Sequence, residues 1–72
     1  MKENDILEMK NFVINSYADL FGCSLSDATK IVEASSFIKV LTATPSFVMH
    51  YSDEYWAKEI NKEMEEKLAL II

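Results

Sequence analysis

The sequence is poor in the residues that build turns, covalent cross-links and anion-binding sites. Its 72 residues contain one glycine, one proline and one cysteine, and all seven cationic residues are lysine, so arginine is absent. A single cysteine excludes an internal disulfide, and without a Cys/His cluster the chain is not expected to hold structural zinc. The scarcity of glycine and proline leaves little turn chemistry for β-hairpins. These absences point away from disulfide-rich, zinc-binding and all-β domains.

The chain is also short of positive charge, with seven Lys against twelve Asp and Glu and a net charge of −5. Nucleic-acid binding needs a positive surface that displaces counterions, and base and phosphate recognition depend heavily on arginine. The N-terminal MKENDILEMK lacks the apolar core of a signal peptide, and the terminal LALII is far shorter than the ~20 residues of a membrane span. We therefore expect a cytoplasmic protein that binds no nucleic acid, membrane, metal or cofactor.

What the sequence has in abundance is apolar residues at helical spacing. Half of the residues are hydrophobic, which suffices for one core in a single domain over residues 1–72. A first helix is predicted from about Asn4 or Asp5 to Phe21, with Asn4 as its N-cap and Gly22 ending it in the left-handed conformation. Steps of three and four define its buried face: Ile6, Met9, Val13, Tyr17 and Leu20, widened by Phe12 and Phe21.

A second helix is predicted from a variant capping box, Ser24 to Asp27, to about Ala34. Its apolar side comprises Leu25, Ala28, Ile31 and Val32. The dense apolar run at residues 37–41 is too short for periodicity to separate helix from strand. We choose helix because the neighbouring segments are helical.

The last third of the chain predicts a short helix and a long one. Thr44 and Pro45 are typical of an N-cap and the first helical residue of a one- or two-turn segment. Ser52 is expected to cap the final helix, whose apolar residues lie four apart: Trp56, Ile60, Met64 and Leu68, with Ile71 near the end. The predicted fold is all-α, a compact orthogonal bundle of four or five short helices.

Residues 47–56, FVMHYSDEYW, hold four of the eight aromatics and the only histidine. We interpret the stretch as a turn that feeds the last helix, with Trp56 in the core and Phe47 beside it. His50 and Tyr51 form a candidate functional turn. A structural role for His50, whose ring would satisfy backbone groups at the junction, is favoured over general-base catalysis because no partner nucleophile is identified.

The order of these segments resembles a family of small bacterial proteins, domain of unknown function 3791, over roughly residues 5–65. That family tends to carry a Tyr-x-x-Leu-His-Thr-x-Gly box followed by an Asp-Ile pair. The matching residues here are Phe47 to Asp53, with Tyr51 in place of the usual Thr and Asp53 in place of Gly, followed by Glu59-Ile60. The resemblance implies a partner or antitoxin-like component of an ADP-ribosyltransferase-like protein.

The C-terminus is unusual because its apolar residues are consecutive. Residues on a helix cannot all face one core, so part of the set should stay exposed: Leu68, Leu70, Ile71 and Ile72. Such clusters usually mark association surfaces, and the alternative is a frayed terminus without a role. We take these residues as a candidate surface for a protein partner or for a homodimer.

The favoured function is a non-enzymatic protein-interaction module. One alternative is a small helix-turn-helix-like DNA-binding regulator, formed by the first two helices around Gly22, although the second helix offers few cations. Another is an enzyme that uses His50 with Cys23. Cys23 precedes the cap of the second helix, where a thiol can become reactive, but a small residue filling an interhelical corner explains it better.

Overall fold

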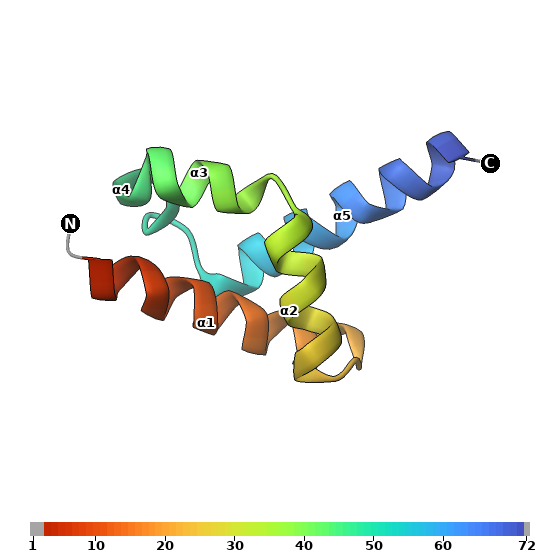
Figure 1. The fold of residues 1–72 in the computed structure, drawn as a ribbon, viewed down its shortest axis with the longest axis horizontal. Helices are drawn as coiled ribbons and strands as arrows, with labels where there is room; N and C mark the ends of the chain where they lie inside the picture. The colour runs from red at the N-terminus through yellow and green to blue at the C-terminus, as the bar shows by residue number, and fades with distance from the viewer. Residues whose placement is uncertain (1–2, 72) are drawn as a thin grey trace.

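The computed structural model describes residues 3–71, and five α-helices make up most of this range (Figure 1). They are α1 (Glu3–Phe21), α2 (Leu25–Ala34), α3 (Phe37–Ala43), α4 (Pro45–Val48) and α5 (Asp53–Ile71). Within residues 3–71 no strand is present, so the all-α prediction is confirmed and residues 37–41 are indeed helical. α1 and α5 pack together, and α2 crosses over both (Figure 1).

The turn between α1 and α2 has the conformation that the sequence predicts. Gly22 adopts φ +64°, and the Cys23 N–H donates to the Ala18 carbonyl at 3.3 Å, a bond that wraps the last turn of α1. The Ser24 hydroxyl then accepts from the Asp27 N–H at 3.1 Å and caps α2. One glycine therefore lets α1 stop and α2 start within three residues.

The other three predicted N-caps have different outcomes. α1 begins at Glu3, so the backbone of Asn4 lies inside the helix and does not cap it. Thr44 is the N-cap residue of α4 and Pro45 its first residue, as expected, but the Thr44 hydroxyl donates backward to the Val40 carbonyl at 2.9 Å and makes no capping bond. The Ser52 hydroxyl accepts from the backbone N–H of Tyr55 at 3.1 Å and caps α5 as predicted.

The buried face of α1 is rotated from the predicted one. Met9, Val13 and Tyr17 are buried as expected, and Ile14 and Ala18 join them. The predicted members Phe12, Leu20 and Phe21 are exposed instead. The buried face is rotated because α1 packs against two helices, α2 and α5, and the residues of α1 that face either of them become buried. Leu25, predicted on the apolar side of α2, is also exposed.

Within residues 47–56, residues 49–52 form a turn that leads from α4 into α5, as the sequence predicts. Trp56 is buried, and its indole Nε1–H donates to the Val48 carbonyl at 2.9 Å. The Phe37 and Phe47 rings lie 5.4 and 6.2 Å from the Trp56 ring, centroid to centroid. Val48 is fully buried beside them. The single tryptophan therefore fixes the α4–α5 turn on the core by packing and by a hydrogen bond.

Candidate interaction surface

The predicted C-terminal surface is exposed where the structure describes it. Leu68 retains 53% of its surface in contact with solvent and Leu70 retains 87%. The backbone of Ile71 completes α5, its side chain is outside what the structure describes, and Ile72 lies outside the described residues. We call residues 68–71 the α5 end. The prediction that part of the set stays exposed is confirmed for the two leucines.

The α5 end is exposed because the helices that cover α5 do not extend that far. Trp56, Ala57 and Ile60 are buried in the core, Met64 is half-buried, and Leu68 is exposed. In Figure 1 the last turns of α5 project past α2 and away from the rest of the molecule. The longest dimension is 40 Å against 22 and 17 Å across. The projecting helix thus carries apolar residues into solvent.

A groove lies in the corner where α2 crosses α5, next to the α5 end. This α2–α5 groove has a volume of about 280 Å³. Its apolar lining comes from Ile31 and Ala34 of α2 and from Ile60 and Met64 of α5, and its remaining lining residues are Lys30, Ser35, Glu63 and Lys67. The sequence did not predict this groove, because it exists only once α2 and α5 cross.

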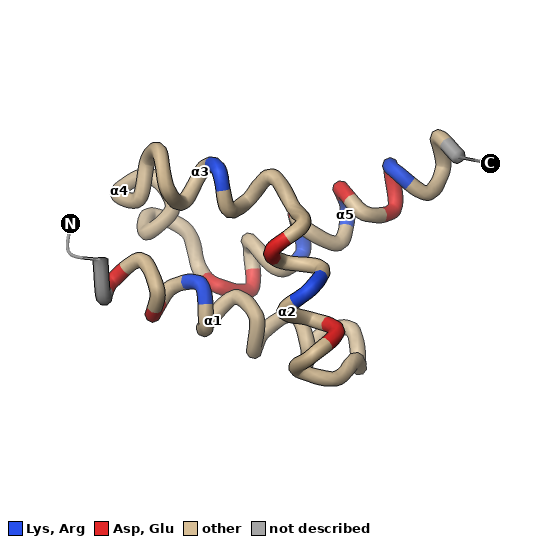
Figure 2. The backbone as a smooth tube through the Cα atoms, viewed as in Figure 1, with Lys and Arg blue, Asp and Glu red and all other residues tan. Residues whose placement is uncertain are grey.

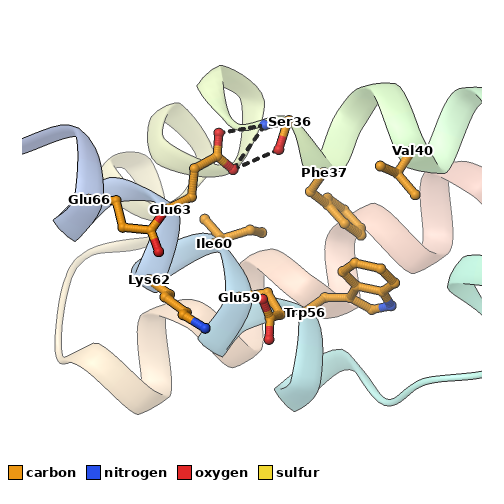
Figure 3. A pocket seen from close by; sticks show the side chains of 9 residues that line it. All are labelled: Ser36, Phe37, Val40, Trp56, Glu59, Ile60, Lys62, Glu63 and Glu66. Carbon is orange, nitrogen blue, oxygen red and sulfur yellow. Dashed lines mark hydrogen bonds between the residues drawn. The ribbon is translucent and has the colours of Figure 1, made fainter.

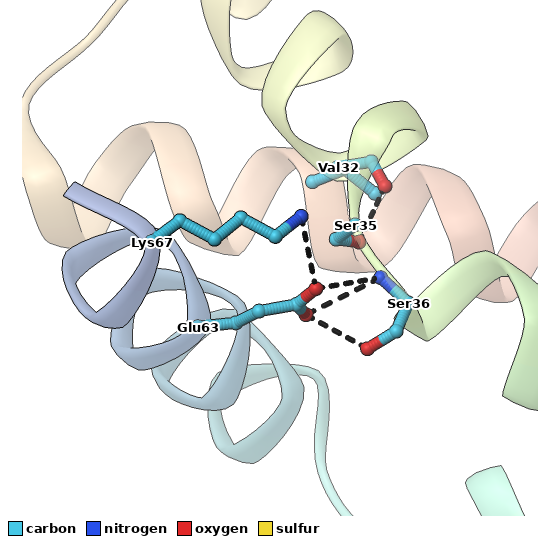
Figure 4. A network of polar contacts seen from close by, with 5 residues as sticks. All are labelled: Val32, Ser35, Ser36, Glu63 and Lys67. Carbon is cyan, nitrogen blue, oxygen red and sulfur yellow. Dashed lines mark hydrogen bonds and ion pairs between the residues drawn. The ribbon is translucent and has the colours of Figure 1, made fainter. Parts of the chain in front are cut away.

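Glu63 joins α5 to the start of α3 (Figure 4). Its carboxylate accepts from the Ser36 backbone N–H at 3.1 and 3.2 Å and from the Ser36 hydroxyl at 2.8 Å. The Lys67 ammonium lies 3.3 Å from the same carboxylate. Ser36 is the N-cap residue of α3 and makes no capping bond with its own side chain; its backbone N–H and its hydroxyl both donate to Glu63. A glutamate distant in sequence therefore fixes the α2–α3 junction against α5.

These contacts also change the acidity of Glu63. Partial burial disfavours the charged carboxylate, but the hydrogen bonds from Ser36 and the nearby Lys67 ammonium outweigh it, so the pKa of Glu63 lies below its ordinary value. The ionised carboxylate is thus the form that the fold stabilises.

A second groove, of about 270 Å³, lies between α3 and α5 on the other side of Glu63 (Figure 3). Phe37, Val40, Trp56 and Ile60 give it apolar walls, and Glu59, Lys62 and Glu66 stand at its edge. It is less apolar than the α2–α5 groove and lies farther from the α5 end.

Tyr17 is the most buried polar-tipped side chain at the α1–α5 contact. Its hydroxyl donates to Asn61 Oδ1 at 3.0 Å and lies 3.9 Å from the sulfur of Met64. Burial, and the neighbouring Cys23 and Glu65, raise the pKa of Tyr17. Both effects disfavour the phenolate, so this hydroxyl serves as a neutral donor that sets the position of α5 on α1.

The candidate functional turn lies on the surface. His50 and Tyr51 are both exposed, and Tyr51 stacks on Tyr55 with ring centroids 4.5 Å apart. Among residues 3–71 the His50 ring finds no hydrogen-bond partner; its backbone N–H donates to Phe47 instead. The predicted capping role of the imidazole is therefore wrong.

Cys23 and His50 are not brought together. Cys23 is half-buried in the α1–α2 turn and packs against the core. Figure 1 shows that turn and the α4–α5 turn, which carries His50, well separated along α1. Neither residue lines the two grooves described above.

The described part of the chain has neither a metal-binding cluster nor a helix that could span a membrane. No group of three or more His, Cys, Asp or Glu side chains is placed to hold a metal ion among residues 5–70, whose side chains the structure describes. Over residues 3–71, no helix combines the length and the apolar character that crossing a membrane requires.

Comparison with known proteins does not assign the chain to a family. No protein-family model matches the chain, and neither the curated proteins nor the solved structures contain a match. The resemblance to the bacterial family, drawn from the residues around His50, stays a prediction.

Proposed function

We propose that this chain is a non-enzymatic protein-interaction module and that the α5 end is its binding surface. The observation that carries the proposal is the exposure of Leu68 and Leu70 on a projecting helix. Burying a leucine side chain fully is worth about 1.5–3 kcal/mol relative to leaving it in water. Two leucines on a ready-formed helix therefore offer binding energy without the cost of ordering a loop.

The rival functions find less support in the arrangement of side chains. For DNA binding, α2 would have to face phosphates, yet Lys30 is accompanied on that helix by Asp27 and Glu33 (Figure 2). Lys10 of α1 is within 3.8 Å of Glu33, so that cation is partly neutralised. For catalysis, the separation of Cys23 from His50 leaves the thiol without the base that would activate it.

The family resemblance supplies one candidate partner, an ADP-ribosyltransferase-like protein in a toxin–antitoxin-like pair. The α5 end is where such a protein would bind, because an apolar helix end fits a hydrophobic groove on a partner. Coexpression with a protein of that class, encoded beside this chain, tests the pairing directly.

The general test is recovery of a stoichiometric partner from the native host, with an N-terminal tag so that the α5 end stays free. We expect the wild-type chain to be isolated with an equimolar protein or as an oligomer of itself. Leu68→Glu and Leu70→Glu should abolish the association. Leu7→Glu is the matched control, because Leu7 is 56% exposed on α1, away from the α5 end. A wild-type chain that is monomeric and without a stoichiometric partner contradicts the proposal.

A further inference from the structure

We infer that the partner of the α5 end is a second copy of this chain, whose α2–α5 groove receives it. Two copies would pair about a two-fold axis, with the α5 helices antiparallel. Leu70 of each copy would then enter the α2–α5 groove of the other. This inference rests on the proposed function and specifies the partner, and three features of the described residues support it: volume, charge and position.

The volume of the groove suits the α5 end. A cavity of roughly 150 Å³ lined by aliphatic side chains accommodates a benzene molecule. The α2–α5 groove, at about 280 Å³, has room for one or two aliphatic side chains. Ile31, Ala34, Ile60 and Met64 provide apolar contact on both sides of the corner. Leu70, the most exposed large hydrophobic residue among the side chains that the structure describes, supplies an occupant of the right chemistry.

The charges beside the groove and beside the tail are complementary. Lys30 lines the groove, and Glu66 precedes Leu70 by one helical turn, on the same side of α5. Among the described side chains, those of residues 5–70, neither Lys30 nor Glu66 has an oppositely charged partner within 4.0 Å. When Leu70 enters the groove, Glu66 approaches Lys30 of the other copy. A basic apolar segment from another protein would instead meet Lys30 of like charge, whereas the charge of Lys67 is offset by Glu63 at 3.3 Å.

The position of the two features allows the contact to close on itself. Met64 and Lys67 line the groove, and Leu68 and Leu70 follow within two helical turns on the same helix. Antiparallel packing of two such helices places each tail over the other copy's groove, so the same contact forms twice. Such a self-complementary interface closes as a dimer and does not propagate into a fibre.

The test measures the oligomeric state of the full chain by sedimentation equilibrium, from about 1 µM to about 1 mM, a range that spans the dissociation constants of weak dimers. We expect a monomer–dimer equilibrium. Leu70→Glu and Ala34→Gln should each raise the dimer Kd by about tenfold or more, since every substitution acts at two symmetric sites. Ala34 is exposed, so the longer side chain fills the groove without entering the core. Leu7→Glu should leave the Kd unchanged.

Charge reversal gives the sharper test. Lys30→Glu and Glu66→Lys should each weaken the dimer, and the double variant should restore it. Circular dichroism identifies any variant that fails to fold, and only folded variants are compared. A wild-type chain that is monomeric throughout overturns the inference. A dimer whose Kd is unchanged by Leu70→Glu and Ala34→Gln also overturns the inference. The same holds if Lys30→Glu and Glu66→Lys each weaken the dimer but the double variant does not restore it. A monomer that still binds a different protein through Leu70 overturns the inference and leaves the proposed function standing.

Discussion

Replacing Glu63 by alanine tests whether a side chain of α5 caps α3. In the native chain the Glu63 carboxylate receives both the backbone N–H and the hydroxyl of Ser36, and Lys67 lies beside it. Alanine leaves the backbone N–H and the hydroxyl of Ser36, the residue before α3, without their acceptor and leaves Lys67 without its partner. We therefore expect the Glu63→Ala variant to fold but to be less stable, with the loss located at the α2–α3 junction.

The size of the loss follows from the geometry. Removing a helix cap costs about 0.5–2 kcal/mol. Hydrogen bonds to a charged group contribute about 1.5–3 kcal/mol where water is excluded. The Glu63 side chain is 25% exposed and Ser36 is exposed, so water replaces part of the lost contact. We expect a loss of about 1.5 kcal/mol, which for a domain of this size lowers Tm by roughly 6–12 °C.

The assay is urea and thermal unfolding followed by circular dichroism at low protein concentration. Glu59→Ala is the control, because Glu59 is an exposed carboxylate on the same helix and has no hydrogen bond or ion pair among the described residues. A double-mutant cycle with Ser36→Ala should show a coupling energy above about 0.5 kcal/mol. A Glu63→Ala variant as stable as the Glu59→Ala control, or a cycle without coupling, would refute the reasoning.

The same interaction predicts a pH dependence. The pKa of Glu63 is lower in the folded chain than its ordinary value, so the unfolded chain takes up the proton first as pH falls. The contribution to the free energy of unfolding is therefore complete above about pH 4.3, the ordinary glutamate pKa, and is lost as pH falls through the lower folded value. The stability difference between the wild type and Glu63→Gln should be constant near pH 7 and should shrink below about pH 4. A difference that grows on acidification would contradict the assigned direction.

Three further predictions concern the core and the turns. Gly22→Ala should lower the free energy of unfolding, measured with urea, by about 1 kcal/mol, because alanine is strained at the φ of +64° that Gly22 adopts. The added Cβ would have no atom within 4 Å, so the loss reports backbone strain alone. Trp56→Phe should cost about 0.5–1.5 kcal/mol, since it removes one of the two hydrogen bonds to the buried Val48 carbonyl, which keeps the Tyr51 N–H as a donor at 3.2 Å. Trp56→Ala should cost more, about 3–5 kcal/mol, by adding a cavity. Ultraviolet titration of the wild type and of Tyr17→Phe identifies the signal of Tyr17 as the one that the variant lacks. We expect that signal to titrate above about pH 10, because the pKa of Tyr17 is raised.

Much of the fold could be predicted because its signals are local. Gly22 has the conformation that only glycine adopts readily, and Ser24 and Ser52 accept the N–H groups of their own helices. Pro45 starts α4 as its fixed backbone angle predicts. Each of these interactions involves residues within four positions of one another, so the sequence contains all the information that decides it.

One error arises from a second local acceptor: the Thr44 hydroxyl makes no capping bond because it donates to the Val40 carbonyl, four residues earlier. The other errors arise where a distant segment competes with a local signal. Phe12 and Leu20 are exposed because α2 and α5 together determine which side of α1 is covered. The role of Glu63 at the start of α3 had no sequence signal, since the two residues that it joins are 27 positions apart.

The candidate site shows the same limit on a single helix. Trp56, Ile60, Met64 and Leu68 recur every four residues without a break, so periodicity predicts one buried stripe along the whole of α5. The exposed fraction nevertheless rises from 2% at Ile60 to 53% at Leu68. At 1.5 Å per residue, those eight residues advance about 12 Å, far enough to pass beyond α2. The apolar repeat of α5 continues beyond the point where other helices pack against it, so the apolar residues at its end remain exposed and available to a partner.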